Sequence, residues 1–268
     1  MRLAAINIHP VKSTAIRSVA EAYVGRSGLV GDREWMVVDG AGKLVSAREL
    51  RELFTIVADT PSTGGRADLR LSAPGHKAIE LTLPTEGVRD IQMFNRVNMR
   101  GRSMGPEADA WLREVLGRED LSLVWCHDPF RRVLDTKDGF TASDHATFQD
   151  ESPLSLITDA SVAAIDGWSE ATITAQRFRP SLRVEGAEEA FAEDGWKEVG
   201  IGPVRFRMIA PISRCVMTTI DPVTLEKDKE PLRTLAIHRK WDGKTWAAVH
   251  LAVVHPGEIA VGDEVIVS

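Results

Sequence analysis

The segment best equipped for chemistry is 211–222, which carries a cysteine beside a fixed positive charge. Arg214 directly precedes Cys215, and a neighbouring cation stabilises the thiolate form of a cysteine. A thiolate is both a nucleophile and a soft metal ligand. Ser213 and Arg214 add hydrogen-bond donors suited to a cofactor oxygen or phosphate. The same pattern also fits a small, buried and inert cysteine on a strand, so the residue types alone leave both interpretations open.

Further basic and hydroxyl side chains lie near expected strand ends. Lys12 and Ser13 follow the first such end, Arg33 lies in a glycine-flanked turn, and Arg179 precedes a proline. Several separated cations on loops suit one polyanionic ligand, because guanidinium groups bind phosphate with two parallel hydrogen bonds. For any one of them alone, a local salt bridge to an acid such as Asp32 is the simpler explanation.

Several familiar catalytic motifs are absent from the sequence. Residues 200–203 begin like a dinucleotide fingerprint, but Arg205 stands where the third glycine belongs. Gly42 and Lys43 lack the upstream glycine of a phosphate-binding loop. The seven histidines show no zinc-ligand spacing, and no nucleophile elbow occurs. These observations argue against nucleotide, zinc and serine-hydrolase chemistry.

The composition is that of an ordinary globular protein. Of 268 residues, 43% are hydrophobic and 27% are charged, and the formal net charge of −6 argues against nucleic-acid binding. Two cysteines, Cys126 and Cys215, cannot build a disulfide framework or a four-thiolate metal site, and we treat Cys126 as structural. No apolar run approaches the roughly 20 residues needed to span a membrane, and the first residues lack a signal-peptide core. We therefore expect a cytoplasmic protein without a membrane partner.

The elements that must position these residues are mostly short strands. A capping box at Ser46–Glu49 predicts a short helix through Phe54, and longer helices are expected at 106–116 and 159–168. Strands are expected at 3–9, 22–24, 35–39, 69–71, 79–83, 121–125, 182–184, 204–209, 247–254 and 259–267. Many short strands with few helices favour a β-barrel-rich α+β fold over a parallel α/β sheet. A seam between about residues 90 and 120 contains no flexible linker, so two domains would be packed together.

Taken in order, the motifs resemble the MOSC family (molybdenum-cofactor sulfurase C-terminal) with its N-terminal β-barrel partner, and within it the amidoxime-reducing component type. The resemblance spans nearly the whole chain. The matching motifs are Pro10-Val11-Lys12-Ser13, Gly31-Asp32-Arg33-Glu34-Trp35, Asp150-Glu151-Ser152-Pro153, Phe178-Arg179-Pro180, Phe191-Ala192-Glu193-Asp194-Gly195-Trp196, Ser213-Arg214-Cys215, Thr218-Thr219-Ile220-Asp221-Pro222, Glu230-Pro231-Leu232-Arg233-Thr234-Leu235, Pro256-Gly257-Glu258-Ile259 and Val261-Gly262-Asp263.

The resemblance implies an N-terminal β-barrel-like domain at 1–115, intergrown with a MOSC β-barrel at 116–268 that carries a few helices, with the first strand able to join the second barrel. It also implies a molybdopterin-type molybdenum cofactor between them. Cys215 would be the metal ligand and the catalytic residue. The implied cofactor-binding residues are Lys12, Ser13, Arg33, Ser152, Arg179, Ser181, Ser213, Arg214 and Cys215.

Two positions depart from the family's pattern. Ser181 stands where the family usually has asparagine, and it is a shorter donor. Residues 247–250 occupy the place of a Phe-Gly-Gln or Phe-Gly-X-Asn stretch, with His250 as either a polar lining residue or a buried core residue.

The activity that the resemblance implies is reduction of N-hydroxylated compounds (amidoximes, hydroxylamines, hydroxylated bases) to amines, by a molybdenum oxidoreductase. Two distant cysteines cannot hold an iron–sulfur cluster, so electrons would come from a separate ferredoxin-like protein or reductase. Two alternatives stay open. One is a non-catalytic carrier of the cofactor or of sulfur, and the other is an anion-binding β-barrel with a buried structural cysteine.

Overall fold

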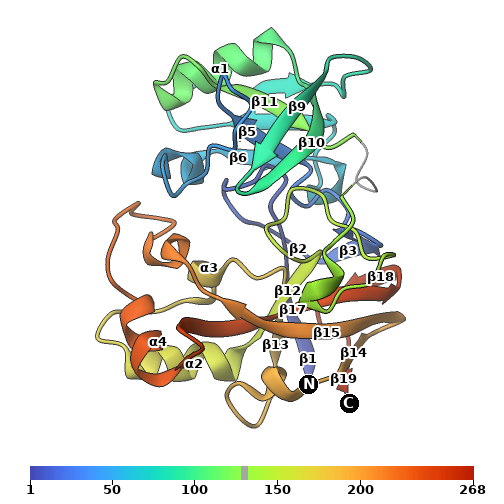
Figure 1. The fold of residues 1–268 in the computed structure, drawn as a ribbon, viewed down its shortest axis with the longest axis vertical. Helices are drawn as coiled ribbons and strands as arrows, with labels where there is room; N and C mark the ends of the chain where they lie inside the picture. The colour runs from blue at the N-terminus through green and yellow to red at the C-terminus, as the bar shows by residue number, and fades with distance from the viewer. Residues whose placement is uncertain (128–131) are drawn as a thin grey trace.

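The computed structural model describes residues 1–127 and 132–268, which form two lobes stacked along the long axis of the molecule (Figure 1). We call the upper one in this view the N-terminal lobe; it contains the sheets β5-β11-β10-β9 and β6-β7-β8 with helix α1. The lower, C-terminal lobe contains the largest sheet, and both chain termini lie there. A cleft between two lobes is a common place for a ligand.

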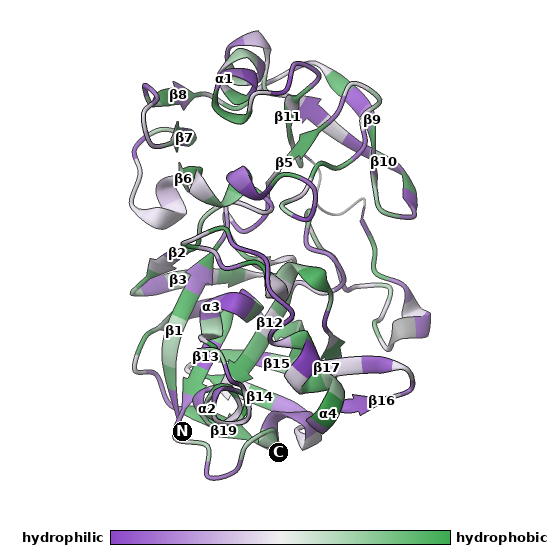
Figure 2. Ribbon diagram, turned by 90° about the vertical axis from the view of Figure 1, so that its left-hand side faces the viewer, coloured by the Kyte–Doolittle hydropathy of each residue, from purple (hydrophilic) through white to green (hydrophobic). Residues whose placement is uncertain are grey.

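A nine-stranded sheet forms the centre of the C-terminal lobe. In spatial order its strands are β19 (Val265–Val267), β14 (Glu198–Ile201), β15 (Val204–Ser213), β17 (Lys244–His255), β12 (Leu154–Thr158), β13 (Leu182–Glu185), β1 (Arg2–Ile8) and β2 (Arg17–Val19), with β16 (Lys240–Trp241) pairing with β17. All pairs are antiparallel except β12 with β13. The central strand β17 is buried from Ala247 to Val253, so both faces of the sheet are covered there. Figure 2 shows these central strands as largely hydrophobic.

Smaller sheets build the N-terminal lobe and attach it to the C-terminal one. The strands are β5 (Trp35–Val38), β11 (Ser122–Trp125), β10 (Arg96–Ser103) and β9 (Val88–Met93) in one sheet; β6 (Val57–Asp59), β7 (Leu69–Ser72) and β8 (Ile79–Leu81) in another; and β18 (Gly257–Ala260), β3 (Glu21–Gly25) and β4 (Gly28–Leu29) in a third. The third sheet pairs early residues with a late strand. The two parts of the chain are therefore interwoven.

The helices are α1 (Pro106–Leu116), α2 (Asp159–Trp168), α3 (Ala175–Phe178) and α4 (Leu232–His238), with 3₁₀ turns η1 (Arg51–Thr55), η2 (Pro61–Thr63), η4 (Thr136–Asp138), η5 (Ala192–Gly195) and η6 (Val216–Thr219). In α1, Pro106 begins the helix, and Gly117 ends it in the left-handed conformation that glycine adopts without steric cost. Among the described residues, no helix is long and apolar enough to cross a membrane.

Two expected elements differ from the structure. The capping box at Ser46 opens only a turn, in which the amides of Glu49 and Leu50 both donate to the Ser46 carbonyl, and a 3₁₀ turn follows in place of a helix. The strand expected at 259–267 is two strands, β18 and β19, because a turn with Gly262 at φ 95° separates them.

The expected β-rich α+β fold is confirmed by these sheets. The division at 115 and 116 stays a prediction. Strand β11 pairs with β5 and β10 of the N-terminal lobe, and β1 lies in the C-terminal sheet. This pairing favours a boundary after Trp125, with β1 assigned to the second domain.

Candidate functional site

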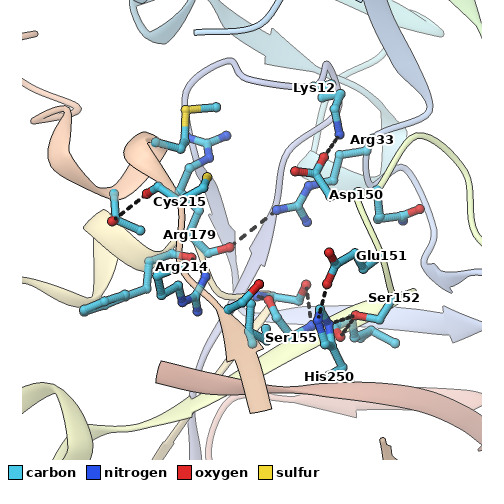
Figure 3. Close-up of a pocket in the computed structure, with 18 of the residues that line it drawn as sticks. Lys12, Arg33, Asp150, Glu151, Ser152, Ser155, Arg179, Arg214, Cys215 and His250 are labelled. Carbon is cyan, nitrogen blue, oxygen red and sulfur yellow. Dashed lines mark hydrogen bonds and ion pairs between the residues drawn. The ribbon is translucent and has the colours of Figure 1, made fainter. Parts of the chain in front are cut away.

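A cavity of about 240 Å³ lies where loops of the two lobes meet, and Figure 3 shows the side chains around it. All nine residues predicted from the sequence to bind a cofactor line this cavity: Lys12, Ser13, Arg33, Ser152, Arg179, Ser181, Ser213, Arg214 and Cys215. Five segments that are separated in the sequence thus contribute to one site. The sequence predicted these residues separately, and the fold brings them together.

Lys12 and Ser13 lie in the turn that follows β1. The Lys12 amide donates to the Trp35 carbonyl at 2.8 Å, which ties this turn to the start of β5. The Lys12 Nζ donates to the Phe148 carbonyl and forms an ion pair with Asp150. Burial lowers the pKa of Lys12 to about 8, although the Asp150 carboxylate opposes this shift. Lys12 is therefore a cation at neutral pH whose charge is lost under mildly alkaline conditions.

Arg33 lies in the turn between β4 and β5 and is held by its acidic neighbour. Its amide donates to the His9 carbonyl at 2.7 Å, and its Nη1 donates to Asp32 at 2.5 Å. Burial raises the pKa of Asp32, but Arg33 and the hydrogen bond from His9 outweigh this effect and hold the pKa at about 2. The sequence-based alternative of a local salt bridge is therefore correct for Arg33, which also lines the cavity.

Arg179 ends the short helix α3 and reaches across to the N-terminal lobe. Its Nη2 donates to the Thr14 carbonyl at 2.7 Å, and its guanidinium lies 5.0 Å from the centroid of the Phe54 ring. Burial, together with the charge of nearby Arg33, lowers the pKa of Arg179 to about 9. The side chain remains a cation at neutral pH.

Three of the cavity residues have left-handed backbone conformations. Ser13, Arg33 and Arg179 have φ angles of 70°, 49° and 50°. Such conformations are uncommon for residues other than glycine and cost on the order of 1 kcal/mol or more each. Strain of this kind gathers where the surrounding structure must hold a side chain in a set direction. Here it turns three donor-bearing residues toward the same cavity.

Cys215 and Arg214 follow the end of β15. The Arg214 amide donates to the Thr245 carbonyl at 2.8 Å, and its Nε donates to the Ala247 carbonyl at 2.8 Å. Burial lowers the pKa of Arg214 to about 10, so it stays charged. Cys215 occupies the N-cap position of η6 without a side-chain capping bond and is exposed, and this corrects the alternative of a buried cysteine at this position.

Arg48 is a site residue that the sequence analysis missed. Its Nη2 lies 3.3 Å from the Cys215 Sγ and 3.1 Å from a carboxylate oxygen of Asp150. Its guanidinium lies 4.7 Å from the centroid of the Phe94 ring. The sequence showed Arg48 only as part of a capping box, and no local signal connects it to a cysteine 167 residues away. The structure adds a second cation beside the thiol.

Asp150 is the acid that balances this group of cations. Burial raises its pKa, but the charges of Lys12 and Arg48 outweigh burial and hold the pKa well below the usual range. The carboxylate is therefore ionised at every physiological pH. It links Lys12 and Arg48, two N-terminal residues, to the loop that precedes β12.

The two positions that depart from the family pattern lie close together in the fold. His250 of β17 is paired with Ser155 of β12, whose Oγ accepts from the Ser181 amide at 3.1 Å. The His250 ring contacts Ser152 and Glu151 at 2.7 and 2.8 Å. His250 lines the cavity and is also buried, so it combines the two interpretations that the sequence left open.

The donors of the cavity fit an anionic cofactor. Within residues 1–127 and 132–268, the buried atoms without a hydrogen-bond partner include Ser13 Oγ, Arg179 Nη1 and Arg214 Nη2, all from cavity-lining residues. A buried donor left unpaired costs about 1–3 kcal/mol, so a ligand that accepts these hydrogen bonds is favoured. The exposed thiol of Cys215 is a soft metal ligand at the rim. A metal complex with an anionic organic part matches this set of donors.

The fold and the site together define a two-lobed, β-rich protein with a cationic cavity beside a single exposed thiol. Residues 1–119 match the model of the MOSC N-terminal beta barrel domain, and residues 143–266 match that of the MOSC domain. The chain belongs to the amidoxime-reducing component family of MOSC proteins.

Relatives in this family are similar over nearly the whole chain. Mitochondrial amidoxime-reducing component 1 of Homo sapiens is 31% identical over 275 residues, covering 96% of this chain and 80% of that protein. Mitochondrial amidoxime reducing component 2 of Rattus norvegicus is 31% identical over 278 residues, covering 96% of this chain and 80% of that protein. Among solved structures, the YUAD protein from Bacillus subtilis aligns with a TM-score of 0.45 at 10% identity, over 98% of this chain and 93% of that one.

Proposed function

We propose that this protein is a molybdenum-cofactor oxidoreductase that reduces N-hydroxylated compounds to the corresponding amines. The observation that carries the proposal is the convergence of unpaired buried donors and an exposed thiol on one cavity. Membership of the amidoxime-reducing component family supports the same activity, because that name describes reduction of amidoximes. Residence in the cytoplasm stays a prediction, and the relatives named above are mitochondrial.

The cavity residues divide into a metal ligand and an anion clamp. Cys215 would supply the protein thiolate to molybdenum. The clamp would bind the organic part and its phosphate through the donors of Lys12, Ser13, Arg33, Ser152, Arg179, Ser181, Ser213 and Arg214. Buried guanidinium groups suit this role, because they keep their charge and bind phosphate with fixed geometry. Arg48 and Asp150 would orient the thiol from the N-terminal lobe.

The reaction consumes two electrons and two protons for each substrate. A hydroxylamine plus two electrons and two protons gives an amine and one water, with cleavage of the N–O bond. The bound cofactor supplies the two-electron redox chemistry for removing the oxygen atom. The chain contributes orientation of the cofactor, and its exposed Cys215 leaves the metal end open to a substrate. The cations around the cavity stabilise the anionic part of the cofactor throughout.

The electrons would come from a separate one-electron donor protein. The chain has two cysteines, which cannot supply the four thiolates of an iron–sulfur cluster. A ferredoxin-like protein or a reductase with a bound redox group fits this requirement. We propose no further partner beyond the small N-hydroxylated substrate.

The test is an anaerobic assay of protein produced in a host that makes the cofactor. The loaded protein should contain near-stoichiometric molybdenum and reduce benzamidoxime to benzamidine with an artificial electron donor. Cys215→Ser should lose at least tenfold in molybdenum content and in turnover, because serine is a poor ligand for this metal. Cys126→Ala is the control, since Cys126 does not line the cavity. This variant should retain both its molybdenum content and its turnover.

Two results would contradict the proposal in different ways. Full molybdenum occupancy with no turnover of any N-hydroxylated compound would favour the non-catalytic carrier instead. A persulfide on Cys215 in such a protein would point to sulfur transfer. Absence of molybdenum from correctly folded protein made in a competent host would reject the cofactor altogether.

A further inference from the structure

The tip of the β9–β10 hairpin places a partly exposed phenylalanine near the thiol end of the cavity. Phe94 and Asn95 form the two-residue turn between the two strands, and the hairpin extends from the N-terminal lobe toward the C-terminal lobe (Figure 1). The guanidinium carbon of Arg48 lies 4.7 Å from the centroid of the Phe94 ring, and the Nη2 of the same arginine lies 3.3 Å from the Cys215 Sγ. A single side chain therefore connects the ring to the thiol.

The backbone of Phe94 has an unfavourable conformation. Its φ angle is 55°, in the left-handed region that bulky side chains rarely adopt. Two-residue hairpin turns usually have glycine, asparagine or aspartate at such a position. A phenylalanine there adds backbone strain, and with 39% of the residue exposed it also leaves apolar surface in water. Closing the hairpin requires neither cost, so the two costs point to a role for the ring at the site.

Two cations hold the Phe94 ring in place. The Lys12 Nζ lies 5.8 Å from the ring centroid, and Arg48 is closer still. Each cation binds one oxygen of the Asp150 carboxylate, so the two lie side by side. A cation near an aromatic face is attracted by the negative potential of that face. These contacts order the ring, and its exposed part is a rigid platform that loses little entropy when it binds a ligand.

A flat aromatic group is the ligand that suits this platform. Aromatic rings attract one another in offset-stacked or edge-to-face arrangements, beyond the gain from buried area alone. Met217, two residues after Cys215, lines the cavity and adds a polarisable apolar side chain near the same end. A substrate whose N–O group approaches the thiol end of the cavity therefore meets apolar surface from both lobes.

We propose that Phe94 is a specificity-determining residue, which stacks on the aromatic group of an aryl amidoxime or aryl hydroxylamine and so favours aromatic over small aliphatic N-hydroxylated substrates. Lys12 and Arg48 position the ring for this contact. The inference rests on the proposed function, because it names the substrate class of the same site.

The first test compares two substrates that share the reacting group. Benzamidoxime carries a phenyl ring where acetamidoxime carries a methyl group. Phe94→Asn removes the ring but keeps the turn, because asparagine tolerates the left-handed conformation. It should lower kcat/KM for benzamidoxime about three- to tenfold, mainly through KM, and leave acetamidoxime within about twofold. Phe94→Tyr keeps a ring and should retain the wild-type preference. The control Val88→Ala lies at the other end of β9, is also 39% exposed and should change neither substrate.

A binding measurement separates this inference from the proposed activity. Protein purified from the cofactor-competent host cannot turn over without an electron donor, so saturation-transfer NMR can measure its affinity for benzamidoxime directly. Wild type and Phe94→Tyr should bind benzamidoxime about three- to tenfold more tightly than Phe94→Asn. This order of affinities in a protein without turnover would reject the reductase and still support the aromatic contact.

Three outcomes would overturn the inference. Equal benzamidoxime affinities in wild type and Phe94→Asn would show that the ring does not touch the ligand. An equal loss for benzamidoxime and acetamidoxime would indicate a general disturbance of the site without discrimination. A loss in Val88→Ala as large as that in Phe94→Asn would assign the effect to the hairpin as a whole and not to the ring.

Discussion

At the scale of single residues, the site combines many buried cations with few acids to balance them. Burial lowers the pKa of Lys12 to about 8, of Arg179 to about 9 and of Arg214 to about 10. Asp150 and Asp32 neutralise part of this charge. The remaining positive charge is a cost to the empty protein and a source of affinity for an anion, since a bound anion restores the balance.

Lys12 should make anion binding depend on pH. Its lowered pKa means that it is charged below about pH 8 and neutral above it. Sulfate affinity of the cofactor-free protein should therefore fall about three- to tenfold between pH 7 and pH 9, because the charged fraction of a group with a pKa of about 8 falls about tenfold over this range. Isothermal titration calorimetry at several pH values measures this change.

Lys12→Arg is the matched control for this pH dependence, because an arginine at this position stays charged over the range. It should flatten the profile between pH 7 and pH 9, because, among the described residues, no other group beside the bound anion loses its positive charge in this range. A wild-type affinity that stays constant from pH 7 to pH 9 would show that the Lys12 charge does not reach the ligand.

Sequence reasoning found residues that carry a local signature and missed those defined by long-range contacts. Cys215 was visible because a cation precedes it, and Lys12 and Arg33 because they lie in turns near strand ends. Arg48 and Glu151 carry no such signal. Their roles arise from contacts with Cys215 and with His250, 167 and 99 positions away in the chain.

At the scale of elements, local pattern was sufficient where one face of an element is buried. Helix α1 begins at Pro106 and helix α2 spans Asp159–Trp168, as the sequence predicts, because proline, glycine and the cap residue mark their ends. The capping box at Ser46 failed, since the following residues pack as a 3₁₀ turn with Leu53 and Phe54 in the core. Tertiary packing outweighed the local signal there.

Glu193 illustrates how one buried side chain positions an element near the site. Its carboxylate accepts from the Thr158 amide at 3.1 Å and from the hydroxyls of Thr158 and Ser161 at 3.0 and 2.9 Å. Thr158 caps helix α2 and ends strand β12. Glu193 thereby connects the turn η5 to the junction of strand β12 and helix α2.

Glu193→Ala should destabilise the protein by about 3 kcal/mol, because it leaves buried donors at the start of α2 without an acceptor. Urea unfolding followed by circular dichroism measures the loss. Glu189→Ala, at an exposed position four residues earlier, should change the free energy of unfolding by less than about 0.5 kcal/mol. Equal stabilities of the two variants would mean that the Glu193 hydrogen bonds contribute nothing net.

At the scale of the whole molecule, the two lobes share a core through the segment that follows Cys215. Ile220 is 2% exposed and belongs to the hydrophobic cluster of the N-terminal lobe, together with Trp35 and Leu53. Arg51 donates to the Leu225 carbonyl at 2.9 Å, which fastens the same segment. The position of the thiol therefore depends on packing in the opposite lobe.

This interlocking predicts that a core substitution in the N-terminal lobe loosens the cofactor. Ile220→Ala removes a buried side chain and should cost about 2–4 kcal/mol of unfolding free energy.

Ile259→Ala is the matched control, because Ile259 is equally buried but lies in β18, in the core of the C-terminal lobe. Urea unfolding should show similar losses of unfolding free energy for the two variants. Only Ile220→Ala should lose molybdenum faster during dialysis of the loaded protein, since only Ile220 anchors the turn that begins at Cys215. Equal rates of loss in the two variants would show that the thiol is held by the C-terminal sheet alone.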